Sequence, residues 1–69
     1  MAELPRAPLE RLLRQAGAER VSDAATEALR EAVEEEALDL AERSRNYAQH
    51  ANRKTVQRED VTAARRERR

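Results

Sequence analysis

Cysteine and histidine, the usual residues of thiol chemistry and of zinc sites, are nearly absent from this sequence. There is no cysteine, and the one histidine, His50, has no second histidine with which to form a metal site or a proton relay. The single glycine, Gly17, leaves no glycine-rich loop that would cradle a nucleotide phosphate. We therefore predict a protein without enzymatic activity, cofactor or metal.

The chemistry that remains is that of charged side chains. The 69 residues carry 14 bases, 13 of them arginines, and 14 acids, so the formal net charge is zero. Six of the acids lie between Glu31 and Glu42, a stretch with no base, and the other 57 residues carry 14 bases against eight acids. A polyanionic partner would therefore have to be bound by a local basic patch that folding brings together. Arginine suits such a partner because its guanidinium contacts phosphate through two hydrogen bonds.

The spacing of apolar residues predicts an all-α chain of three helices joined by two short loops. A short helix carries apolar residues at i, i+3, i+4 and i+7 from Leu9 and ends before Gly17. A long helix starts after Ser22, its N-cap, and continues to Ala51 over about 28 residues, or roughly 42 Å. A third, short helix follows Gln57.

The apolar residues of the chain have too little volume for a core of ordinary size. Fourteen of them are alanines, beside seven leucines, four valines, one methionine and one tyrosine. A chain of this length buries only about 60% of its unfolded surface and needs a further source of stability. Because the long helix extends beyond any core that the chain could form alone, we expect an obligate oligomer. Leu29, Val33 and Leu40 on that helix are the expected dimer core.

Two stretches of the sequence resemble the loop regions of archaeal histones. The matching segments are AGAERVSD (16–23), HANRKTV (50–56) and EDV (59–61), together with ELP (3–5) and AP (7–8) near the start. The resemblance covers the whole chain without a gap. It implies a single histone-fold domain over residues 1–69, with short, long and short helices, that pairs with a second chain in a handshake dimer. In such a dimer the first loop of one chain lies beside the second loop of its partner, with Val21 and Val56 as apolar anchors.

The resemblance also implies which residues contact DNA. Arg20 matches the loop arginine that enters the minor groove, and Thr55 matches the threonine that holds this arginine in place. Lys54 matches a lysine that contacts phosphate, and Arg11 and Arg14 match basic positions of the first helix. The residues expected to bind DNA are Arg11, Arg14, Arg20, Ser22, Arg53, Lys54 and Thr55.

Further roles follow from the same resemblance. Arg53 and Asp60 match a salt bridge within the chain, and Tyr47, His50 and Asp60 match residues that join one dimer to the next. A tyrosine serves in such a contact only if its hydroxyl reaches a partner or water. Gly17 matches a small residue that lets successive dimers stack closely.

The sequence departs from the family pattern at several apolar positions. Glu36 stands where the family tends to bury an apolar residue, and Ala63, Arg65 and Arg68 replace residues of the third helix that are often apolar. We expect a thinner core than usual. We also expect the acidic stretch between Glu31 and Glu42 to weaken DNA binding or to limit stacking.

These observations predict a chromatin protein. A homodimer would bind, bend or wrap and compact double-stranded DNA without a base-sequence code, and would form a tetramer or a higher polymer along it. The sequence has no membrane span and no signal peptide, so we expect it in the cytoplasm on the nucleoid. Two other classes stay open. One is a histone-fold interaction subunit that forms a heterodimer with another chain, as transcription-factor subunits of this fold do, or with another histone, and that binds little DNA itself. The other is a helical assembly factor without a nucleic-acid role.

Overall fold

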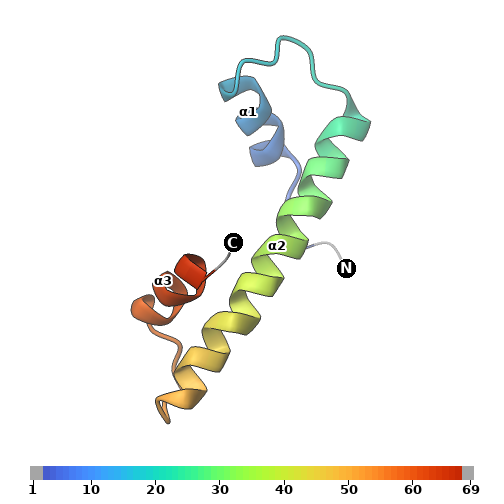
Figure 1. Cartoon of the computed structure of the whole chain (residues 1–69). Helices are drawn as coiled ribbons and strands as arrows, with labels where there is room; N and C mark the ends of the chain where they lie inside the picture. The colour runs from blue at the N-terminus through green and yellow to red at the C-terminus, as the bar shows by residue number, and fades with distance from the viewer. Residues whose placement is uncertain (1–2, 68–69) are drawn as a thin grey trace. The chain divides into compact units, whose positions relative to one another are not determined.

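The computed structural model describes residues 3–67 and has three helices, α1 (Ala7–Gln15), α2 (Asp23–His50) and α3 (Arg58–Glu67) (Figure 1). No strand occurs in that range. The predicted all-α order of short, long and short helices is confirmed. The chain divides into two compact units between Glu35 and Glu36, and α2 belongs to both. The expectation of a single domain stays a prediction.

The first unit begins with α1 and the loop that follows it, loop 1 (residues 16–22). α1 ends in a Schellman motif, in which the N–H of Gly17 donates to the carbonyl of Arg14 (3.0 Å) and the N–H of Ala18 to that of Leu13 (3.1 Å). Gly17 has φ +110°, which an L side chain rarely adopts, so the glycine is needed for the turn itself. Its expected part in stacking stays a prediction.

Ser22 caps the start of α2, as the sequence predicts. Its Oγ accepts a hydrogen bond from the N–H of Ala25 at 3.0 Å, and its carbonyl accepts from the N–H of Thr26 at 3.1 Å. Asp23 places a negative charge in the first turn, where the helix dipole favours it. The chain therefore leaves loop 1 in a fixed direction.

Arginine and glutamate side chains hold the first unit together. Arg30 is buried on α2 and forms salt bridges with Glu27 and, at 2.9 Å, with Glu34. The other carboxylate oxygen of Glu34 accepts a hydrogen bond from the N–H of Glu3 at 2.7 Å. Arg6 lies 3.7 Å from Glu27. The bond to Arg30 lowers the pKa of Glu27 and raises that of Arg30. This network attaches the start of the chain to α2.

The second unit begins on α2, which ends one residue earlier than predicted, at His50. Asn52 has φ +60°, and its N–H donates to the carbonyl of Gln49 at 2.9 Å, while the N–H of Arg53 donates to that of Ala48 at 2.9 Å. This is a second Schellman motif, with asparagine in the left-handed position instead of glycine. Backbone hydrogen bonds thus set the first end of loop 2 (residues 51–57), and the carboxylate of Asp60 fixes the other end.

Asp60 joins loop 2 to α3. Its carboxylate accepts two hydrogen bonds from the guanidinium of Arg53, at 2.7 and 2.8 Å, and one from the N–H of Gln57 at 2.8 Å. The Arg53 guanidinium holds the pKa of Asp60 below its usual value, and the carboxylate raises that of Arg53. The expected pairing of Arg53 with Asp60 is therefore present in the structure.

Few apolar residues are buried in either unit. Among residues 3–67, Leu9, Ala48 and Ala64 are the buried hydrophobic residues. The expected dimer-core residues Leu29, Val33 and Leu40 are half-buried, and Glu36 is exposed. Large apolar side chains are exposed as well: Leu12, Leu38, Val56 and Val61. The single chain therefore has the thin core that the composition predicts. Arg68, one of the residues that stand at often apolar positions of the third helix, lies outside the described residues.

Removing the cap of α2 should destabilise the protein measurably. We expect Ser22→Ala to lower the free energy of unfolding by about 1 kcal/mol, because the N–H of Ala25 loses its acceptor. Ser22→Asn, which keeps a capping oxygen, should lie close to the wild type. Urea unfolding at one protein concentration measures both. If the alanine variant is as stable as the wild type, the hydroxyl contact is not what stabilises the helix start.

The pair of Arg53 and Asp60 should make stability depend on pH. Because the folded pKa of Asp60 is lowered, the pair stabilises the protein fully above the unfolded aspartate pKa of about 4 and loses this contribution as the pH falls through the folded value. The melting temperature of Asp60→Asn should therefore lie below the wild type at neutral pH, and the difference should shrink below about pH 4. Glu42→Gln, at an exposed carboxylate of α2 with no salt bridge among residues 3–67, is the control. A difference that does not change with pH would contradict this role.

Candidate DNA-binding surface

Loop 1 presents Arg20 on a rigid backbone. The Schellman motif at Gly17 and the cap at Ser22 fix its two ends, and Arg14 donates a hydrogen bond to the carbonyl of Glu19 at 3.3 Å. Arg20 is exposed and forms no salt bridge with any residue from 3 to 67. Its guanidinium is therefore free to contact an external anion.

The two cations expected on α1 differ in their surroundings. Arg11 is exposed and, within the described range, unpaired. Arg14 forms a salt bridge with Glu10, one turn earlier, at 3.1 Å, and both side chains are about half exposed. An exposed salt bridge of this kind contributes between 0 and about 1 kcal/mol to the stability of the fold. Arg14 therefore loses little free energy when it leaves Glu10 for another anion.

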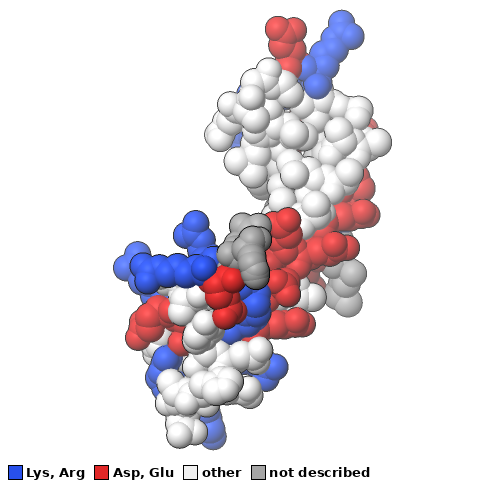
Figure 2. Space-filling view, viewed as in Figure 1, with Lys and Arg blue, Asp and Glu red and all other residues white. Residues whose placement is uncertain are grey.

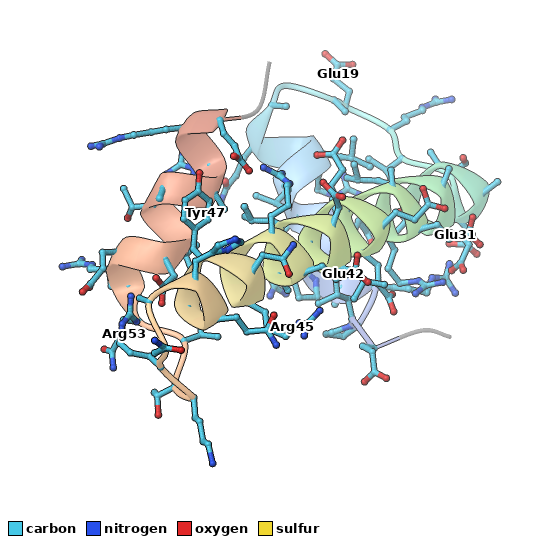
Figure 3. The ribbon with its side chains drawn as sticks, turned by 60° about the horizontal axis from the view of Figure 1, so that its bottom comes forward. Glu19, Glu31, Glu42, Arg45, Tyr47 and Arg53 are labelled. Carbon is cyan, nitrogen blue, oxygen red and sulfur yellow. The ribbon has the colours of Figure 1, made fainter. Side chains whose placement is uncertain are left out.

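The three residues of loop 2 that the resemblance assigned to DNA differ in exposure and in their partners: Arg53, Lys54 and Thr55. Lys54 and Thr55 are exposed, and Lys54 has no ion-pair partner in the described part of the chain. Arg53 instead turns inward to Asp60 and also approaches the carbonyl of Thr55 at 3.5 Å (Figure 3). In this structure Arg53 therefore shapes the loop, and Lys54 is the cation that the loop displays.

The residues expected between dimers already have polar partners in their own chain. The hydroxyl of Tyr47 donates to the Glu67 carboxylate at 2.8 Å, which raises the pKa of the phenol. Nδ1 of His50 lies 2.9 Å from the carbonyl of Asn46. Asp60 is 3% exposed. Among residues 3–67, no hydrogen bond or salt bridge joins any two of these three side chains.

Sequence reasoning missed the charged residues that position the helices. Arg43 bonds to Asp39 at 3.1 Å and to the carbonyl of Ala64 at 2.6 Å, so it holds α3 against α2. Arg30 is buried among glutamates. The sequence did contain a signal for these salt bridges, the spacing of four residues on one helix between Asp39 and Arg43 and between Arg30 and Glu34. Such pairs are usually exposed on a helix, and spacing alone does not distinguish a buried one.

Charge is distributed unevenly over the surface. Figure 2 shows carboxylates along the visible side of α2 and basic side chains over α3. No group of three or more His, Asp or Glu side chains in residues 3–67 is arranged to hold a metal ion. The described helices also include none that is long and apolar enough to cross a bilayer. The arrangement offers separate exposed cations on two capped loops and one helix, which suits contact with a phosphate backbone.

Comparison with known proteins agrees with these features. The family model described as histone-like transcription factor (CBF/NF-Y) and archaeal histone matches residues 2–64. The chain is 55% identical over 64 residues to one of the subunits of archaeal histone HAN1 of Thermococcus zilligii, covering 93% of this chain and 96% of that protein. It is 58% identical, with the same coverage, to probable archaeal histone 3 of Methanocaldococcus jannaschii. The resemblance seen in the loops is confirmed: the chain belongs to the family of histone-like transcription factors and archaeal histones.

Proposed function

We propose that this chain is a DNA-binding chromatin protein that acts as a histone dimer on the chromosome. The observation that carries the proposal is the exposure of Arg20 and Lys54, unpaired within residues 3–67, on two loops whose ends are fixed by capping contacts. Its two relatives are both named as archaeal histones. That agreement favours this function over a helical assembly factor and over an interaction subunit with little DNA binding.

The proposed contact is with the DNA backbone and not with base sequence. Arg20 enters the minor groove where the groove faces the protein, Lys54 contacts phosphate beside it, and Arg11 adds charge from α1. Arg14 joins by leaving Glu10. Contacts of this kind depend on charge and on the flexibility of the DNA, so the protein bends or wraps many sequences.

A second chain is needed to complete the protein. The described chain buries one leucine, Leu9, among its larger apolar residues and leaves Val56 and Val61 exposed. Leu29 and Leu40 are half-buried on α2. We propose that a second α2 covers these side chains in a homodimer and brings loop 1 of one chain beside loop 2 of the other. A heterodimer is the result expected if the purified chain does not fold alone.

Loss of either loop cation should weaken DNA binding for every sequence. We expect Arg20→Gln and Lys54→Gln each to reduce the affinity for a random duplex of about 60 bp, and to lower the slope of log K against log salt by about 0.9 for each phosphate that is no longer neutralised. Arg45→Gln, at an exposed arginine that belongs to α2 and not to either loop (Figure 3), should change both quantities much less. Fluorescence anisotropy across a salt series measures them.

Two outcomes of that titration would contradict the proposed contact. One is a loss confined to particular DNA sequences, which would indicate base readout by Arg20. The other is an equal loss in Arg45→Gln, which would indicate that only total charge matters.

Folding and dimerisation should be coupled. The melting temperature should rise with protein concentration, because dissociation accompanies unfolding. Leu29→Ala should destabilise the dimer by about 2 kcal/mol or more, since the partner covers this side chain. Leu38→Ala, at a leucine that is 60% exposed, should stay within about 0.5 kcal/mol of the wild type. Calorimetry at several concentrations tests this, and a melting temperature independent of concentration would point to a stable monomer.

A further inference from the structure

A carboxylate lies among the cations of α1. Arg11 and Arg14 are three residues apart and are therefore neighbours on the helix surface, and Glu10 stands one turn before Arg14. Nη2 of Arg14 lies 3.1 Å from Oε2 of Glu10. Arg11 is exposed, and the side chains of Glu10 and Arg14 are about half exposed. The part of α1 that is proposed to contact DNA therefore carries an anion of its own.

The guanidinium of Arg14 bridges α1 and loop 1. Its other terminal nitrogen, Nη1, donates to the carbonyl of Glu19 at 3.3 Å, and Glu19 is the residue just before Arg20. A guanidinium presents its N–H donors in a rigid planar fork, and here each terminal nitrogen meets an oxygen. Glu10 and the loop backbone together thus hold the Arg14 side chain in one orientation before any DNA binds.

The carboxylate of Glu10 and a DNA phosphate offer Arg14 the same kind of contact. Both present anionic oxygens that accept charge-assisted hydrogen bonds from a guanidinium. A phosphate that approaches Arg11 and Arg14 also comes close to Glu10, and like charges repel each other. Nη2 of Arg14 therefore has to exchange the carboxylate for the phosphate, whereas Nη1 can keep its bond to the loop carbonyl.

The other cations proposed to contact DNA have no such competitor. Arg11, Arg20 and Lys54 form no salt bridge with any residue from 3 to 67. The acid that precedes Arg20, Glu19, is exposed and also has no salt bridge in that range. Figure 3 shows its side chain directed outward from loop 1. Among these four cations, Arg14 is the one that a carboxylate of the described chain engages.

We infer that Glu10 competes with DNA for Arg14. In the free protein its carboxylate occupies the place on Nη2 that a phosphate oxygen takes in the complex. This competition lowers the affinity for DNA and the salt dependence of binding, so the protein releases DNA more readily than its exposed cations alone would predict. The inference rests on the proposed function and concerns the strength of binding, not whether DNA is bound.

Removing the charge of Glu10 tests this inference by fluorescence anisotropy across a salt series. Glu10→Gln should raise the affinity for the random duplex about threefold, as expected when two weak salt bridges per dimer no longer compete. The slope of log K against log salt should steepen by up to about 0.9 for each phosphate that is newly neutralised. Glu19→Gln, the same change at an exposed carboxylate beside Arg20, is the control and should raise the affinity less. An equal gain in both variants would show that only the total negative charge matters and would overturn the inference.

A double-mutant cycle separates this competition from an effect on the helix. Glu10 also lies in the first turn of α1, where the helix dipole favours an acid, so its removal affects the helix as well. The gain from Glu10→Gln should disappear in the Arg14→Gln background, because no guanidinium is left to release. A gain that persists there overturns the inference. A loss of affinity in Glu10→Gln alone does so too, since it would mean that Glu10 orients Arg14 for DNA. A wild type that does not bind the duplex overturns the proposed function itself.

Discussion

A shortage of apolar volume governs how this chain is held together. Of the three buried hydrophobic residues among residues 3–67, two are alanines, Ala48 and Ala64, so neither short helix is attached to α2 by much apolar surface. Guanidinium–carboxylate contacts supply the attachment instead, through Arg6 with Glu27 in one unit and through Arg43 with Glu67 in the other. Such contacts are directional, and they position elements well while contributing modest stability. A scaffold built this way needs a second chain for its free energy of folding.

The presence or absence of a nearby carboxylate divides the arginines of the described chain into two groups. Those with a carboxylate within hydrogen-bonding reach, such as Arg30 and Arg53, turn inward and orient loops and helices. Those without one, such as Arg11 and Arg20, extend into solvent and are available to phosphate. Neutral net charge and DNA binding are compatible for this reason, because much of the positive charge is neutralised locally while Arg11, Arg20 and Lys54 stay exposed on α1 and the loops.

Local signals in the sequence predicted the helices well, because caps and turns depend on neighbouring residues. Ser22 begins α2, Gly17 adopts its left-handed turn, and Asn52 ends α2 with an error of one residue. Burial of Arg30 and the contact of Tyr47 with Glu67 were not predicted, since they depend on side chains that meet only after the helices pack.

The set of DNA-binding residues stays a prediction, and the side-chain directions in loop 2 show why sequence alone does not settle it. Resemblance assigned both Arg53 and Lys54 to DNA, but the direction in which each side chain points depends on the position of Asp60 in α3. The pairing of loop 1 with loop 2 involves two different chains, so a single sequence supports it only through the resemblance. Spacing within one chain carries no information on such a contact.

Tyr47 also determines the ultraviolet absorption and fluorescence of the protein. It is the only tyrosine, and the chain has no tryptophan or phenylalanine. All of the near-ultraviolet absorption and intrinsic emission of the protein therefore arise from one ring, whose hydroxyl is bonded to the last turn of α3. The molecule carries a built-in spectroscopic reporter with no background from other aromatic groups. Its signal follows the joining of α3 to α2 without any added label.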